Sequence, residues 1–83
     1  MIISITQKVN GYEYTPLWKN FEKYIETSFS IEINLQFTTV DKYKDSTLKS
    51  YTARVYSSLY SNEELFVRFS NEELGSLFLL KFS

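Results

Sequence analysis

The segment from residue 30 to residue 40 alternates apolar and polar residues, and it constrains the fold more than any other stretch of the chain. A period of two is typical of a β-strand with one face buried and the other face in water. The pattern predicts that Ser30 to Val40 is the central strand of an antiparallel sheet. The predicted buried positions are Ile31, Ile33, Leu35 and Phe37, and the predicted wet positions are Glu32, Asn34, Gln36 and Thr38.

The first thirty residues predict a strand, a tight turn and a helix. Ile2 to Val9 alternates in the same way and predicts a first strand. Asn10-Gly11 suits a two-residue turn, because both positions tolerate positive φ, so Tyr12 to Tyr14 is expected to return as a short strand. Thr15-Pro16 is typical of a helix start. The apolar stripe that follows predicts an amphipathic helix over about residues 16–28, with one face on a sheet.

The second half of the chain predicts an exposed connection and further strands. Asp41 to Ser50 crowds charges and hydroxyls without alternation, so we expect a connection there. Tyr51 to Ser57 and Leu65 to Phe69 predict strands. Leu77 to Phe82 also predicts a strand. The alternative is a helix over Asn71 to Leu80, which Gly75 would disfavour by about 1 kcal/mol.

A pentapeptide occurs twice in the last third of the chain. Ser61 to Leu65 reads Ser-Asn-Glu-Glu-Leu, and Ser70 to Leu74 repeats it. A single echo is too little for a repeat architecture, so we interpret it as the same turn chemistry used twice.

Together these elements predict an α+β fold. One amphipathic helix (about 16–28) packs on one face of an antiparallel sheet of four to five strands, in the order β-α-β-β-β-β. The 83 residues allow one compact domain, 1–83. Its core must be dense, because folding buries a smaller fraction of the surface of a short chain than of a long one. Seven Phe, seven Tyr and one Trp supply that density.

The composition argues against most enzymatic chemistry. Histidine and cysteine are both absent, so the commonest general base, the usual metal ligands and the Cys/His nucleophile pairs are missing. Two glycines cannot build a glycine-rich phosphate loop. We therefore expect no catalytic site, no cofactor and no metal, and a minimal enzyme that uses carboxylates ranks last.

The net charge and the hydropathy of the chain limit the classes of partner and the compartment that we expect. A net charge of −1 lacks the basic surplus of a dedicated nucleic-acid binder. The first residues are too short and too polar for a signal peptide, and no apolar run approaches the roughly 20 residues that span a bilayer. With no Cys to indicate an oxidising compartment, we expect a cytoplasmic protein without a membrane partner.

Three groups of residues are candidates for partner binding. Parity predicts that the outer face of the sheet gathers arginine and aromatic side chains, the composition of interface hot spots. Lys42-Tyr43-Lys44, followed by Lys49, Tyr51 and Arg54, interleaves basic and aromatic residues, which can hold a single nucleic-acid strand. Acidic turns can imitate phosphate in a basic groove, or they are simply solvated. The candidates are Arg54, Tyr56, Phe66 and Arg68 for the face, Tyr43 for the interleaved segment, and Glu63, Glu64, Glu72 and Glu73 for the turns.

These observations favour a small protein-binding module without enzymatic activity. Free-standing proteins of this size are often encoded by phages or other mobile elements and occlude a host enzyme, so we expect an inhibitor of a host defence system. A binder of single-stranded nucleic acid that uses the sheet face is one alternative. A homodimer joined through an exposed strand edge is another.

Overall fold

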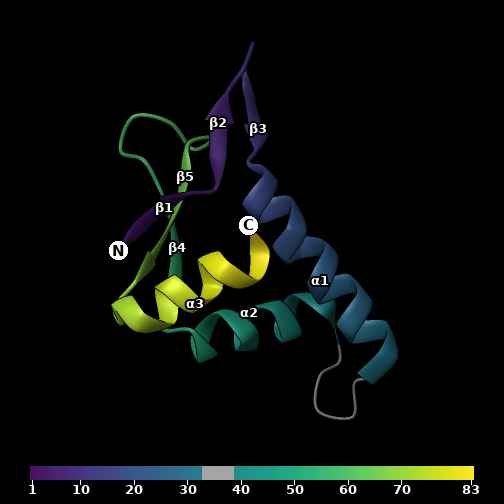
Figure 1. The fold of residues 1–83 in the computed structure, drawn as a ribbon. Helices are drawn as coiled ribbons and strands as arrows, with labels where there is room; N and C mark the ends of the chain where they lie inside the picture. The colour runs from purple at the N-terminus through teal and green to yellow at the C-terminus, as the bar shows by residue number, and fades with distance from the viewer. Residues whose placement is uncertain (33–38) are drawn as a thin grey trace.

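The computed structural model describes residues 1–32 and 39–83, which form three helices and five strands in two antiparallel sheets (Figure 1). The predicted α+β class and the antiparallel pairing are confirmed, whereas the arrangement of one helix on one sheet is wrong. The elements are β1 (Ile2–Ser4), β2 (Thr6–Lys8), β3 (Tyr12–Tyr14), α1 (Pro16–Glu32), α2 (Val40–Ser50), β4 (Ala53–Ser57), β5 (Leu65–Phe69) and α3 (Glu72–Phe82).

The larger sheet has the strand order β1-β5-β4, so the first strand of the chain pairs with the last. Ile3 and Val55 flank Val67 in register on its two sides. The predicted strand Ile2 to Val9 is split between two sheets, because the buried Ile5 stands between β1 and β2. Its N–H donates to the Leu65 carbonyl at 2.8 Å, and its carbonyl accepts from the Thr15 N–H at 2.8 Å.

The smaller sheet is the hairpin of β2 and β3. Asn10 and Gly11 have positive φ of 54° and 117°, as the sequence predicts, but Lys8 pairs with Tyr12, so the connection has three residues, Val9 to Gly11, rather than the predicted two. Helix α1 then begins at Pro16, as predicted, and ends at Glu32 rather than near residue 28. The Thr15 hydroxyl accepts the Trp18 N–H at 3.5 Å and helps to cap this helix.

The predicted central strand, Ser30 to Val40, is wrong at both ends. Residues 30–32 continue α1, and Val40 begins α2. Residues 33–38 of the prediction lie outside the described residues. The central strand of the larger sheet is β5 instead, which was predicted with its observed bounds.

Helix α2 occupies the segment predicted to be an exposed connection. Thr39 caps it by accepting the Lys42 N–H at 3.2 Å. Leu48 is its one fully buried side chain, so the apolar periodicity is too weak to indicate a helix. The half-buried Tyr43 and Thr47 complete an inner stripe at helical spacing.

Helix α3 replaces the predicted strand Leu77 to Phe82. Asn71 caps it by accepting the Leu74 N–H at 3.1 Å, so the second copy of the pentapeptide starts a helix. A Cβ added to Gly75 would lie 2.8 Å from the Met1 sulfur and 3.0 Å from Cγ of Phe69. Glycine thus lets α3 lie close to β5 and to the first residue. This packing outweighs the low helix propensity of glycine.

The two copies of the pentapeptide differ in structure. In the first copy, the Glu63 N–H donates to the Ser61 hydroxyl at 3.1 Å in a turn before β5. The interpretation that both copies share one turn is therefore wrong, because only the second begins a helix.

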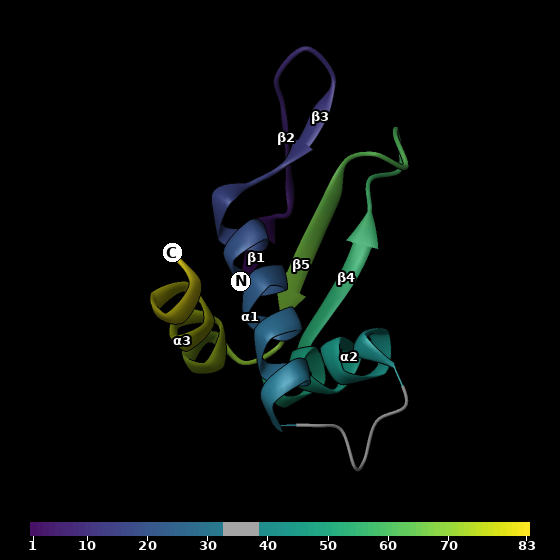
Figure 2. The same cartoon turned by 90° about the vertical axis from the view of Figure 1, so that its right-hand side faces the viewer.

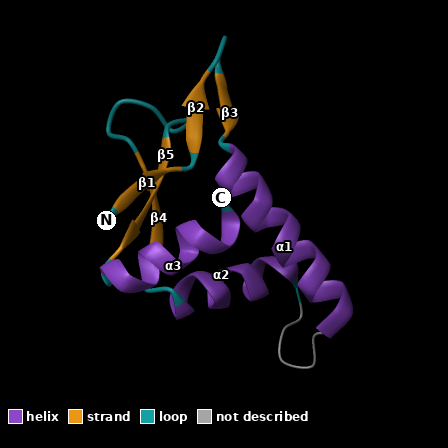
Figure 3. Ribbon diagram, viewed as in Figure 1, coloured by secondary structure: helices purple, strands orange, loops and turns teal. Residues whose placement is uncertain are grey.

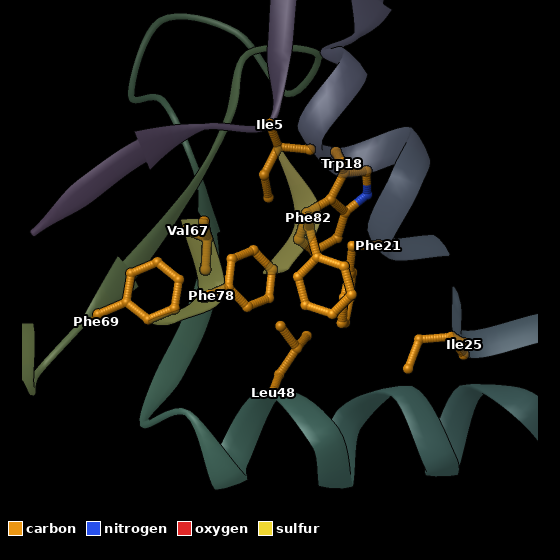
Figure 4. Close-up of a cluster of buried hydrophobic side chains, with 9 residues drawn as sticks. All are labelled: Ile5, Trp18, Phe21, Ile25, Leu48, Val67, Phe69, Phe78 and Phe82. Atoms are coloured by element: carbon orange, nitrogen blue, oxygen red, sulfur yellow. The ribbon is translucent and has the colours of Figure 1, made fainter. Parts of the chain in front are cut away.

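All three helices lie on one side of the larger sheet and enclose an aromatic core (Figures 3 and 4). Phe78 is at its centre, with ring centroids 5.0 Å from Phe21, 5.1 Å from Phe69 and 4.8 Å from Phe82. Within residues 1–32 and 39–83, the other side of the sheet carries no helix (Figures 1 and 2). The buried hydrophobic side chains of the described part of the chain are Ile5, Trp18, Phe21, Ile25, Leu48, Val67, Phe69, Phe78 and Phe82.

Candidate functional site

The side of the larger sheet that faces away from the helices gathers the predicted face residues. The register places Arg54 opposite Arg68 and Tyr56 opposite Phe66. Residues directly opposite on antiparallel strands project to the same side of a sheet. Val67, with the opposite parity, is buried in the core, so these four side chains project away from it. We call the following six residues the outer face: Ile2, Ser4, Arg54, Tyr56, Phe66 and Arg68.

The aromatic pair forms the apolar part of the outer face. The rings of Tyr56 and Phe66 are stacked, with centroids 5.6 Å apart and an interplanar angle of 28°. The side chain of Tyr56 is 38% exposed, and Phe66 is half-buried. Such a pair stabilises a sheet by about 0.5–1.5 kcal/mol and still presents apolar surface to a partner.

The arginine pair gives the outer face a local positive charge. Arg54 and Arg68 are both exposed, and within the described residues neither takes part in an ion pair or a side-chain hydrogen bond. Like charges directly opposite each other on neighbouring strands destabilise a sheet. The pair therefore costs the isolated fold some stability, although the whole chain is slightly acidic.

The loop between β4 and β5 carries two exposed apolar residues that the sequence reasoning missed. Leu59 is 99% exposed and Tyr60 is 94% exposed. The Ser58 N–H donates to the Glu64 carbonyl at 2.8 Å and closes the base of this loop. The loop projects from the end of the sheet, on the side away from α1 (Figure 1). Two apolar residues inside a run of serine and asparagine were the available signal.

The four candidate acids do not gather in one place. Glu63 and Glu64 precede β5, and Glu72 and Glu73 follow it, so a five-residue strand of roughly 16 Å separates the two pairs. Glu64 accepts a hydrogen bond from the Tyr12 hydroxyl at 3.5 Å. The other pair lies in the first turn of α3, where acidic side chains interact favourably with the helix dipole.

The interleaved basic and aromatic residues run from α2 into β4, and only Arg54 among them belongs to the outer face. Tyr43 is half-buried against the core, with its ring 6.1 Å from that of Phe29. The Lys44 ammonium lies 3.4 Å from a Glu22 carboxylate oxygen and 5.2 Å from the Trp18 ring centroid. These side chains hold α2 against α1.

Three further findings concern chemistry and relatives. Residues 1–32 and 39–83 contain no group of three or more acidic, histidine or cysteine side chains placed to hold a metal ion. In the same part of the chain, every helix is too short or too polar to cross a membrane. Comparison with known proteins found no matching family model, curated protein or solved structure.

Proposed function

We propose that this chain is a non-enzymatic module that binds another protein through the outer face and the Leu59–Tyr60 tip. The observation that carries the proposal is the pair Arg54 and Arg68, opposite each other and without an acidic partner among the described residues. Because this pairing disfavours the isolated sheet, the fold alone gives no reason for it. An acidic group on a partner would relieve the repulsion by accepting hydrogen bonds from both guanidinium groups.

The rest of the surface fits the same kind of partner. Tyr56 and Phe66 each lie two residues along the strand from an arginine, on the same side of the sheet. An apolar side chain beside the acidic group would therefore contact their rings. Arginine and aromatic residues dominate interface hot spots, since they combine large buried area with directed hydrogen bonds. Leu59 and Tyr60 add apolar contacts beyond the end of the sheet.

Single-stranded nucleic acid is the second candidate, because the unpaired arginines would also bind phosphate. The geometry of the two aromatic rings argues against this candidate. The rings of Tyr56 and Phe66 stack on each other with centroids 5.6 Å apart. One face of each ring is therefore covered and cannot stack on a base. The net charge of −1 supplies no long-range attraction to a polyanion either. We therefore favour a protein partner.

The experiment is affinity capture from a lysate of the native host with three baits. The first is the wild type, and the second is the double variant Arg54→Glu, Arg68→Glu. This variant keeps a like-charge pair across the strands, so its folding should change little. The third is Lys8→Glu, Lys42→Glu, which makes the same change in net charge at exposed positions away from the outer face.

We expect one defined protein to be retained by the wild type and by the lysine variant and to be lost with the arginine variant. Recovery of nucleic acid that is lost as salt rises would favour the second candidate. Equal retention by all three baits would contradict both. The prediction that the partner is a host enzyme, inhibited by occlusion, is tested by identifying the retained protein and assaying it with the chain added.

A further inference from the structure

Strand β4 leaves one edge of the larger sheet unpaired. Within the described residues β4 pairs with β5 alone, and it forms the margin of the sheet (Figure 2). The Ser70 N–H donates to the Thr52 carbonyl at 3.1 Å, which assigns the even-numbered residues of β4 to the hydrogen-bonded ladder. The backbone groups of Ala53, Val55 and Ser57 therefore point outward from this edge. None of them has a hydrogen-bond partner in the described part of the chain.

Within the described residues, this edge lacks most of the features that keep other strands from adding; Arg54 is its one charged side chain, and it points to the outer face rather than inward. Proteins protect edges with proline, bulges, very short strands or charges that point inward. The register of β4 with β5 is continuous over five pairs, and no proline occurs in it. Ala53 and Val55, which share the core side with Val67, carry no charge. The opposite margin of the sheet is β1, which has only three residues.

A groove of about 590 Å³ lies between the second half of α2 and the first half of β4. Val55 is on the core side of the sheet, yet it is 40% exposed, so this part of the edge has an uncovered apolar surface. Around it the charges are mainly positive, with three cations and one acid. The lining residues that matter here are Leu48, Ala53 and Val55, the cations Lys49, Arg54 and Arg68, and the acid Asp45.

We infer that an extended acidic segment of the partner protein adds to β4 as an antiparallel strand. This inference rests on the proposed function and specifies how that partner binds. Alternate side chains of an added strand point to opposite sides. One set would fill the groove beside Val55 and Leu48, and the other would bring a carboxylate next to Arg54, on the side of the sheet that also carries Arg68. A second copy of this chain fits less well, because Ala53–Ser57 contains an arginine and no acid.

The test uses synthetic probes and nuclear magnetic resonance. The first probe is the blocked heptapeptide Thr-Val-Glu-Val-Glu-Val-Thr, and the second replaces both Glu with Lys. We expect the first to shift the amide resonances of Ala53, Val55 and Ser57 and to slow their hydrogen exchange. The lysine peptide should bind at least tenfold more weakly. Equal binding of the two peptides, or shifts confined to other residues, would overturn the inference.

Two N-methylated peptides test the backbone pairing itself. In an antiparallel pair, a valine placed opposite Val55 exchanges both backbone hydrogen bonds with it. Methylation of the central valine amide should therefore reduce binding at least tenfold. Methylation of the neighbouring glutamate amide, which points away from β4, should have little effect. If the two methylated peptides bind equally well, or in the reverse order, the antiparallel strand addition is wrong.

One variant separates this inference from the proposed function. Val55→Pro removes an outward N–H that β5 does not use, and proline is tolerated at such edge positions. In the capture experiment, we expect it to lose the partner that Val55→Ala retains. If Val55→Pro is folded and keeps the partner while the arginine variant loses it, strand addition fails and the proposed function stands.

Discussion

Truncating Phe78 and Leu80 separately tests whether the C-terminal segment is a helix. The two positions are two residues apart, so a strand would place them on the same face, whereas a helix separates them by about 200° around its axis. In the structure the Phe78 side chain is 0% exposed and the Leu80 side chain is 78% exposed. The two truncations should therefore have very different costs.

The expected costs follow from these surroundings. Phe78→Ala removes a buried ring that contacts four others, those of Phe21, Tyr51, Phe69 and Phe82. Such a truncation typically costs about 3–5 kcal/mol. A chain of 83 residues is stable by only about 4–12 kcal/mol at typical values per residue. Leu80→Ala should change the free energy of unfolding by less than about 0.5 kcal/mol.

The assay is urea denaturation followed by circular dichroism, with the free energy of unfolding compared at a common slope. If Phe78→Ala is unfolded without urea, the milder Phe78→Leu gives a measurable curve and should still be clearly less stable than Leu80→Ala. Similar costs for the two alanine variants would refute the placement of α3 and favour a strand there.

Three further predictions concern the helix cap, the close packing and the arginine pair. Asn71→Ala should cost about 1 kcal/mol by removing the cap of α3, whereas Asn62→Ala, at the matching position of the first pentapeptide, should be neutral in the same denaturation assay; equal costs would show that the cap does not matter. Gly75→Val should destabilise by about 1–3 kcal/mol through overpacking, and a more stable variant would mean that the close contact is absent. Arg54→Glu should stabilise the fold by about 0.2–1 kcal/mol at low salt by pairing with Arg68, and a loss of stability would argue against repulsion in the wild type.

Local signals predicted the elements whose conformation depends on neighbouring residues. Asn10-Gly11 specified its turn through positive φ, and Thr15-Pro16 specified the start of α1. The predicted bounds of Leu65 to Phe69 match the observed strand, because both of its neighbours in the sheet fit its alternation.

The failures arise where distant residues decide the structure. Gly75 has the low helix propensity that argued for a strand, but contacts with Phe69 and with Met1, at the far end of the chain, require its small size. The alternation of Ile2 to Val9 is real, but burial of Ile5 divides it between two sheets. Neither effect can be read from a local pattern.

In the candidate site, too, some features follow from local sequence patterns and others depend on distant residues. Parity on paired strands was enough to place Arg54, Tyr56, Phe66 and Arg68 on one side. The exposure of Leu59 depends on how far its loop projects, which no periodicity encodes. The unpaired edge of β4 depends on β1 being the other neighbour of β5, and that pairing joins the two ends of the chain.

The most direct test of the central claim is the affinity of the captured partner for Tyr56→Ala, measured by calorimetry beside the wild type and Leu80→Ala. Tyr56 is exposed on the outer face, and its removal should weaken binding by at least about 2 kcal/mol, or roughly thirtyfold. The free energy of unfolding should fall by no more than about 1.5 kcal/mol, the value of the ring pair. Leu80→Ala should bind like the wild type. If Tyr56→Ala binds the partner as tightly as the wild type does, the outer face is not the binding surface.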